Sequence, residues 1–257
     1  MLAMLQTLAE WLNLSAGATL LALGGVLVAG VVRGFSGFAL TATVMASLVL
    51  ILPPIELIPV CLILEGVATL FMLRSGLREA DLPMVAALSV GTLIGLPIGL
   101  TITTTVSPDA SKMLAQSLVL GLALAQIFQY RPSWLISVPA RYAAGALAGV
   151  AAGLAGVGGM VIALFVLAQM APPRVMRGSL VVFLCISLLI GGAYQVSFGI
   201  MTEQAIQRGL VLAPVAVIGV LAGKQLFRPG LEPGYRKFCL GLLITLASAG
   251  LVKAVVF

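Results

Sequence analysis

A glycine-rich break inside apolar sequence occurs twice in this chain and constrains its fold more than any other feature. The first copy is Arg33-Gly34-Phe35-Ser36-Gly37-Phe38, and the second is Gly153-Leu154-Ala155-Gly156-Val157-Gly158-Gly159. One shift along the sequence superposes Gly30, Gly34 and Gly37 on Gly149, Gly153 and Gly156, and Pro53-Pro54 on Pro172-Pro173. We interpret the chain as two copies of one unit, because membrane transporters are often built from two repeats with interrupted helices.

The composition indicates whether these segments lie in water or in a lipid bilayer. The chain is 61% hydrophobic and 9% charged, whereas about a quarter of the residues in soluble domains are charged. Apolar runs of membrane-spanning length follow one another through nearly the whole sequence. The sequence therefore predicts an all-α polytopic membrane protein and excludes a soluble globular one. The net charge of +6 is spread through short loops, so it does not indicate a nucleic-acid partner.

The predicted organisation is one membrane domain made of two repeats. Residues 1–16 are expected to form an interfacial helix, 17–129 the first transmembrane repeat, 130–139 a cytoplasmic linker and 140–257 the second repeat. Each repeat is a glycine-broken helical pair followed by about three transmembrane helices. Pro83 and Ser107-Pro108-Asp109 are expected to begin helices. The arms of the first break are predicted at Gly17 to Arg33 and at Gly37 to Leu52.

The 14 Lys and Arg residues indicate whether each broken pair is one kinked helix or a hairpin whose arms return to the same side. In a hairpin topology one face of the membrane carries only Lys112, Arg208 and Lys253, and Arg33 lies in the break. The opposite face collects Arg74, Arg78, Arg131, Arg141, Arg174, Arg177, Lys224, Arg228, Arg236 and Lys237. A single-helix topology shows no such bias. Because cytoplasmic loops are rich in Lys and Arg, we predict hairpins, inverted repeats and two periplasmic termini.

The two breaks are expected to meet inside the protein, because irregular backbone in a bilayer needs protein or water around it. Arms that begin at about Gly37 and Gly158 would point their N-termini at this place, and free N–H groups there favour an anion. The predicted residues for a small anionic substrate are Arg33, Gly34, Phe35, Ser36, Gly37, Phe38, Thr41, Gly153, Gly156, Val157, Gly158 and Gly159. Alternatively, the glycines only allow close helix packing, and Arg33 only extends to the cytoplasmic interface.

Four polar residues inside apolar segments are predicted to act in coupling or gating. Glu65 has no loop nearby, and it either carries a coupling proton, pairs with Arg33 or is a hydrogen-bonded structural residue. Ser187, Tyr194 and Gln195 either line the cavity or, for Tyr194, anchor a helix end at the interface. Glu56, beside Pro53-Pro54, is expected to be merely solvated.

Other chemistry has little support in the sequence. The chain has no His, and Cys61, Cys185 and Cys239 stand singly in apolar segments. We therefore predict no catalytic residue, no metal site and no cofactor. Two GxxxG spacings, Gly95 to Gly99 and Gly219 to Gly223, are expected to let helices approach closely.

Together these residues resemble the sulfite exporter family of the TauE/SafE type, also called the toluenesulfonate uptake permease family. The resemblance rests on the two glycine-rich breaks, each followed by an apolar helix and a Pro-Pro turn, and it covers essentially the whole chain. It implies a bacterial inner-membrane transporter for sulfur oxyanions such as sulfite, sulfoacetate or aromatic sulfonates. The residues alone also fit a carboxylate permease, an anion channel, or a membrane enzyme or assembly factor.

Overall fold

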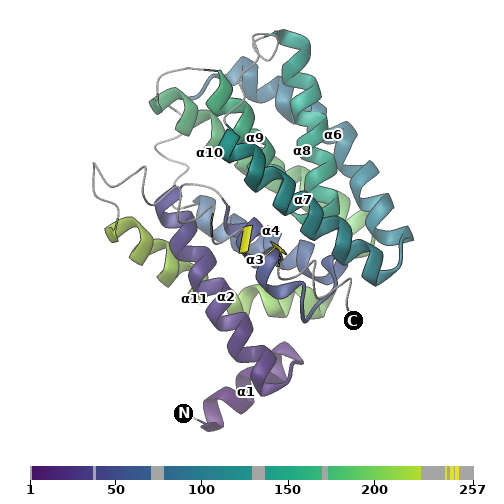
Figure 1. The fold of residues 1–257 in the computed structure, drawn as a ribbon, viewed down its shortest axis with the longest axis vertical. Coiled ribbons are helices and arrows are strands. Elements are labelled where there is room, and N and C mark those ends of the chain that lie inside the picture. Colours follow the sequence, from purple (N-terminus) through teal and green to yellow (C-terminus); the bar gives the residue numbers. More distant parts are fainter. Residues whose placement is uncertain are drawn as a thin grey trace.

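The computed structural model describes residues 2–36, 39–70, 78–128, 137–169 and 173–226, with Gly241, Ile244, Thr245, Ala247 and Ser248. These residues contain ten helices and no strand, which confirms the all-α prediction. In chain order (Figure 1) the helices are α1 (Leu2–Leu12), α2 (Ala16–Ser36), α3 (Leu40–Leu48), α4 (Pro54–Leu70), α6 (Leu82–Thr105), α7 (Pro108–Phe128), α8 (Val138–Ala155), α9 (Gly158–Ala168), α10 (Pro173–Ser197) and α11 (Glu203–Leu226).

Six of the helices in the described ranges are long and apolar enough to cross a membrane. They are α2, α6, α7, α8, α10 and α11. Large apolar side chains such as Leu20, Ile94, Leu147 and Leu189 are exposed on them, as expected for surfaces that face lipid. The prediction of a multi-pass membrane protein is therefore confirmed.

Local sequence signals begin the two helices that the prolines predict. Asp81 caps α6, where its Oδ1 accepts a 3.0 Å hydrogen bond from the N–H of Met84, and Pro83 lies in the first turn. The Ser107 hydroxyl accepts a 3.3 Å bond from the N–H of Ala110 at the start of α7. Both side chains satisfy N–H groups that have no acceptor within the helix. Both predicted starts are confirmed.

Each glycine break reverses the chain. A Cβ atom placed on Gly25 of α2 would lie 2.8 Å from Ser47 Oγ near the end of α3, so α3 returns along α2. A Cβ atom on Gly158, the first residue of α9, would lie 2.5 Å from the carbonyl oxygen of Ala148 on α8. Gly156, between α8 and α9, has a φ of 66°, a left-handed conformation that glycine adopts easily. The structure thus has a hairpin at each break instead of a kinked helix.

The first reversal lies further along the chain than predicted. Helix α2 continues to Ser36, and α3 begins at Leu40 and not at about Gly37. The N-cap of α3 is Ala39, whose φ of 71° is in the left-handed region. Gly37 and Phe38, two of the predicted substrate residues, lie outside the described part of the chain.

Close backbone contacts between glycines join α2 to α11 and α8 to α6. A Cβ atom on Gly34 would lie 2.1 Å from the carbonyl oxygen of Val220 on α11, so Gly34 stays helical and serves packing. A Cβ atom on Gly153 of α8 would lie 2.5 Å from the N atom of Leu100 on α6. The glycines of both GxxxG spacings lie in the same two contacts, which confirms their predicted role: Gly95, Gly99, Gly219 and Gly223.

These contacts exchange helices between the two predicted repeats. Helix α2, the first arm of the first hairpin, packs against α11 of the predicted second repeat. Helix α8, the first arm of the second hairpin, packs against α6 of the predicted first repeat. Gly34 corresponds to Gly153 at a shift of 119 residues, whereas the partner glycines Gly95 and Gly99 correspond to Gly219 and Gly223 at a shift of 124 residues. This exchange supports a relation between the repeats, whereas their boundaries and their inverted orientation in a membrane stay predictions.

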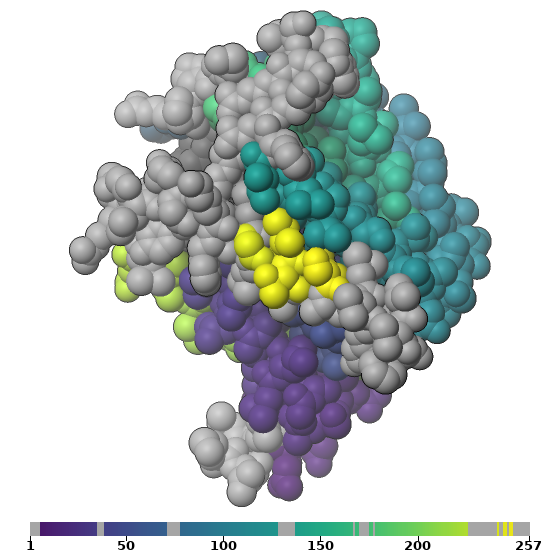
Figure 2. Space-filling model, viewed as in Figure 1, coloured from purple at the N-terminus to yellow at the C-terminus, as the bar shows by residue number. Residues whose placement is uncertain are grey.

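The buried apolar residues form two clusters. The larger is centred on α3 and α4, and the smaller lies between α6, α8, α9 and α10. Figure 1 shows α1, α2 and α11 on one side of the molecule, α6 to α10 on the other, and α3 and α4 between them. The space-filling view shows the N-terminal helices in purple at one end and the blue-green α6 and α7 beside them (Figure 2). The candidate site lies where the two clusters meet.

Arg208, in the first half of α11, connects three elements. Its Nε donates a 2.8 Å hydrogen bond to the carbonyl oxygen of Leu12 at the end of α1. Its guanidinium also pairs with Glu56 in the first turn of α4. The expectation that Glu56 is merely solvated is therefore wrong, because its carboxylate compensates a buried cation.

Candidate functional site

Arg33 of α2 and Glu65 of α4 form an ion pair inside the protein. Arg33 Nη2 and Glu65 Oε1 are 2.6 Å apart, and the two side chains are 1% and 10% exposed. The Thr69 hydroxyl, one turn further along α4, accepts a 3.2 Å hydrogen bond from Arg33 Nη2 and donates a 3.5 Å bond to Glu65 Oε1. Of the interpretations open for Glu65, the structure shows the pair with Arg33, and Arg33 is buried instead of extended to an interface.

The ion pair belongs to the wall of a partly open cavity of about 60 Å³. This volume has room for a few water molecules or one small anion. Seven helices and the turns of both hairpins supply its lining: Arg33, Ala39, Thr41, Ile58, Cys61, Leu62, Glu65, Leu96, Ala152, Gly156, Gly158, Gly159, Met160, Leu184, Ser187, Leu188, Gly191 and Gln195.

The N-termini of α3 and α9 both begin at this cavity. Thr41 lies in the first turn of α3, and Gly158 and Gly159 are the first two residues of α9. First-turn N–H groups have no acceptor within their own helix and carry the positive end of the helix dipole. The two hairpins therefore bring two groups of hydrogen-bond donors to one space, as their glycine breaks predict.

Helix α10 contributes an amide and a hydroxyl to the cavity. Gln195 is 3% exposed, and its Oε1 has no hydrogen-bond partner among the described residues. Ser187 lies about two turns earlier on the same helix and also lines the cavity. Buried polar atoms are nearly always hydrogen-bonded in proteins. Because Oε1 accepts hydrogen bonds, it suits a donor on the cavity wall, supplied by water or by a ligand group that carries an N–H or O–H.

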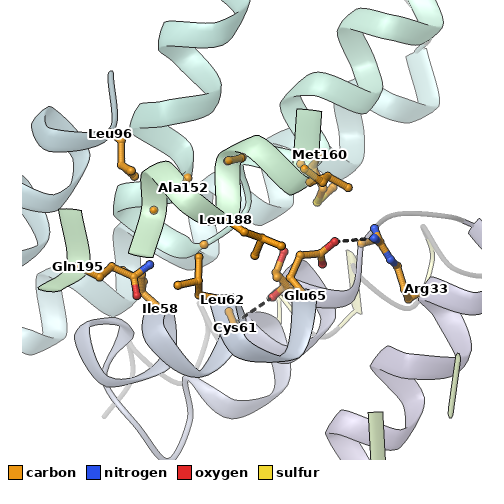
Figure 3. Close-up of a pocket in the computed structure, with 18 residues that line it drawn as sticks. Arg33, Ile58, Cys61, Leu62, Glu65, Leu96, Ala152, Met160, Leu188 and Gln195 are labelled. Atoms are coloured by element: carbon orange, nitrogen blue, oxygen red, sulfur yellow. Dashed lines mark hydrogen bonds and ion pairs between the residues drawn. The ribbon is translucent and has the colours of Figure 1, made fainter. Parts of the chain in front are cut away.

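Polar groups mark two ends of the cavity, and apolar groups separate them. Figure 3 shows the Arg33–Glu65 pair at one end and Gln195 at the other. Leu62 and Leu188 lie between these ends in the same view. A ligand that spans the cavity would thus contact charge, then apolar surface, then an amide.

Eight of the sixteen predicted site residues line the cavity: Arg33, Thr41, Gly156, Gly158, Gly159, Glu65, Ser187 and Gln195. Four others lie elsewhere. Gly34 and Gly153 are in the helix contacts described above, and Val157 is buried in the larger apolar cluster. The Tyr194 hydroxyl donates a 3.1 Å hydrogen bond to the carbonyl oxygen of Leu93 on α6. The structure does not describe the side chains of Phe35 and Ser36, nor the residues Gly37 and Phe38.

One face of α4 carries lining residues that the sequence analysis did not single out. Ile58, Cys61 and Leu62 lie one to two turns before Glu65, at spacings that share a helix face. Thr69 follows Glu65 by one turn. The helical period around Glu65 could have predicted these lining residues, because residues three and four positions from an intramembrane acid lie on the same helix face and share its environment. Cys61, one of the three cysteines that stand singly in apolar segments, is buried and also faces the cavity.

These features define a class of protein: a multi-pass helical membrane protein with a cavity, polar at both ends, at the meeting of two hairpins. The sequence model of the family described as "Sulfite exporter TauE/SafE" matches residues 21–250. The chain belongs to the sulfite exporter TauE/SafE family, which confirms the resemblance seen in the sequence. No match was found among curated proteins or among solved structures. Membership identifies the protein as a membrane transporter of the sulfite exporter type.

Proposed function

We propose that this protein is a secondary transporter that moves a small sulfur oxyanion, an organosulfonate or sulfite, across the bacterial inner membrane. The anion is held between the starts of α3 and α9, and the cavity opens to the two sides alternately. The observation that carries the proposal is the convergence of two helix N-termini and Arg33 on one cavity.

The donors at the cavity suit a tetrahedral oxyanion. First-turn N–H groups at Thr41, Gly158 and Gly159 are of the kind that holds sulfate and phosphate at helix N-termini. Gly158 and Gly159 carry no side chain, so a ligand approaches their backbone closely. The guanidinium of Arg33 matches an oxyanion with parallel hydrogen bonds. The family's description as a sulfite exporter agrees with this chemistry.

The apolar centre of the cavity favours an organosulfonate among the candidate substrates. A sulfonate head near Arg33 would leave its organic part beside Leu62 and Leu188. The buried amide of Gln195 suits a polar group at the other end. A carboxylate with the same shape is the second candidate, because helix N-termini and Arg33 also bind carboxylates.

Ligand binding to the purified protein tests the site. Sulfite, sulfoacetate, taurine, toluenesulfonate, sulfate and acetate are titrated by calorimetry and thermal shift. We expect one sulfonate or sulfite to stabilise the protein and acetate to have no effect. Selective stabilisation by acetate would instead identify a carboxylate permease.

Two glycine variants locate the bound anion. In Gly159→Ala the new methyl group would lie 3.2 Å from Leu184 Cδ2 at the cavity wall. A leucine side chain adjusts to such a contact, so the fold is kept while the binding space at α9 shrinks, and we expect weaker binding. The control is Gly192→Ala on α10, where the methyl group meets only Leu62 at an ordinary 3.8 Å. Equal binding by both variants would contradict the site.

A further inference from the structure

We propose that Glu65 is the proton carrier of this transporter and that Arg33 exchanges Glu65 for the substrate. An anion that enters the cavity takes the place of the Glu65 carboxylate at Arg33, and the released carboxylate binds one proton. Anion and proton then cross the membrane together. This inference rests on the proposed function, which does not itself name a coupling ion.

The first step follows from the position of the ion pair. Arg33 and Glu65 are both lining residues, so their contact borders the space where an anion would enter. The pair is also a link between two helices, α2 and α4, at one end of the cavity (Figure 3). An oxyanion and a carboxylate compete for the same guanidinium hydrogen bonds, because both are planar or tetrahedral anions with paired oxygens.

The second step follows from Thr69. Its hydroxyl accepts a hydrogen bond from Arg33 and donates one to Glu65, so it lies between the two charges. A hydroxyl rotates and is both donor and acceptor. Thr69 therefore stays hydrogen-bonded whether Glu65 is a carboxylate or a carboxylic acid. This allows the pair to separate without leaving a buried polar group alone.

The third step is the balance of charge. Arg33 and Glu65 together carry no net charge. An anion that entered without any other change would leave one uncompensated negative charge in a mainly apolar interior, which is strongly unfavourable. Binding of one proton at the released Oε1 of Glu65 restores a net charge of zero. The proton comes from hydronium on the side from which the anion enters, so one O–H bond of hydronium breaks as the O–H bond of Glu65 forms, and no group is oxidised or reduced.

Within the described ranges, few other ionisable groups face Glu65. Arg33 comes from α2, and Cys61 is on the same face of α4. The cavity-lining residues of α3, α6, α8, α9 and α10 are uncharged. Among the helices packed on α4, α7 has the exposed pair Asp109–Lys112, and α8 has Arg141 and Tyr142, which do not line the cavity. Helix α11 has Arg208, which is paired with Glu56, and the exposed Glu203 and Lys224. Glu65 is thus the acid placed to take the proton.

Proton movement in proteoliposomes tests the inference on the wild-type protein. The probes are methanesulfonate and toluenesulfonate, permanent monoanions that cannot carry a proton across the bilayer themselves. A lumenal pH dye and labelled anion are followed while valinomycin and potassium set the membrane potential. We expect lumenal acidification with about one proton per anion, because the charge in the site is conserved, and no effect of the potential.

The outcomes separate the two proposals. Sulfonate uptake without acidification, or uptake driven by the membrane potential, would overturn the proton carrier and leave the transporter intact. No uptake of either sulfonate would overturn the inference and exclude these organosulfonates as substrates. Uptake of labelled sulfite by the same vesicles then decides the proposed function, which its absence would contradict.

The variant Glu65→Gln tests whether Glu65 is the residue that carries the proton. In Glu65→Gln we expect sulfonate binding to persist, because Arg33 and the helix N-termini remain, while acidification is lost and uptake becomes dependent on the potential. Asp109→Asn, which removes an exposed carboxylate on α7, is the control and should keep proton coupling. Proton-coupled uptake by Glu65→Gln would overturn the assignment. If that variant does not fold, Glu65→Asp, which keeps the charge of the pair, replaces it: the shorter carboxylate should shift the pH dependence of coupled uptake, and an unchanged pH profile would overturn the assignment.

Discussion

Gln195 is buried with an amide oxygen that lacks a partner among the described residues, and such an atom lowers stability. Gln126 on α7 is also buried, and both of its amide atoms lack partners there, but it does not line the cavity. Both residues therefore lower the stability of the fold through a buried amide atom without a partner, but only Gln195 lies at the cavity. At the scale of single residues, we therefore expect Gln195 to contribute to ligand binding and Gln126 to have only a structural effect.

Replacement of each glutamine by leucine measures that difference. Removal of an unpartnered buried amide is expected to leave the unfolding free energy unchanged or raise it by about 1 kcal/mol in both variants. Only Gln195→Leu should weaken binding of a sulfonate that carries a hydrogen-bond donor, such as taurine, by about fivefold, since a hydrogen bond contributes about 1 kcal/mol. Thermal unfolding and calorimetry provide the two readings. Unchanged affinity for such a sulfonate in Gln195→Leu would exclude Gln195 from the site.

Arg33 and Glu65 make a second prediction at this scale. Arg33→Met leaves a buried carboxylate without its cation, so we expect a loss of about 3–5 kcal/mol in the free energy of unfolding. The double variant Arg33→Met/Glu65→Leu should recover most of this loss, because apolar groups often replace buried ion pairs without cost. Chemical unfolding in detergent measures both.

The same double variant shows whether the ion pair is needed for transport as well as for stability. The double variant is expected to fold and to move no sulfonate, since it keeps neither the guanidinium nor the proton carrier. A matched control is Lys112→Met, which breaks an exposed ion pair and should change neither property. A double variant as unstable as Arg33→Met alone would show that the pair is not isolated from other buried charges.

At the scale of helices, the α2–α11 and α6–α8 contacts depend on glycines that admit no side chain. We expect Gly34→Ala and Gly153→Ala to destabilise the protein similarly, because each methyl group would collide with backbone and not with a flexible side chain. Overpacking of this kind typically costs about 1–3 kcal/mol. Thermal unfolding of the two purified variants measures the effect.

Gly24 supplies the control for this prediction. It also lies in α2, but a Cβ atom there would meet nothing within 4 Å. Gly24→Ala should therefore raise stability by about 0.5–1 kcal/mol through helix propensity. Equal effects at Gly24 and Gly34 would mean that the close contact between α2 and α11 does not form.

The helices whose starts depend on local sequence could be predicted, and those that depend on distant contacts could not. Asp81-Leu82-Pro83 caps α6 with atoms a few residues apart. The first break was misplaced because Gly34, which reads as a helix breaker, is held in α2 by Val220 on α11. The cavity shows the same division. The glycines predicted a meeting of hairpins, whereas the pairing of Glu65 with Arg33 depends on α3 and α11, against which both α2 and α4 pack.

At the scale of the whole molecule, the distribution of Lys and Arg predicts an orientation in the membrane. Both termini should be periplasmic, and the linker at 130–139 should be cytoplasmic. Alkaline phosphatase is active in the periplasm, and green fluorescent protein fluoresces in the cytoplasm. Fusions at the C-terminus should therefore be active with the phosphatase and dark with the fluorescent protein. The opposite pattern would contradict the predicted orientation.

Counterflow in proteoliposomes tests the central claim, a carrier for a sulfur oxyanion, most directly. Vesicles loaded with unlabelled toluenesulfonate or sulfoacetate are diluted into a trace of the same labelled anion. We predict a transient accumulation of label above its external concentration, because a carrier with a saturable site exchanges one anion for another. Acetate loaded in place of the sulfonate should not produce it. Equilibration of label without any overshoot would instead show a channel, and no entry at all of either sulfonate would contradict the account.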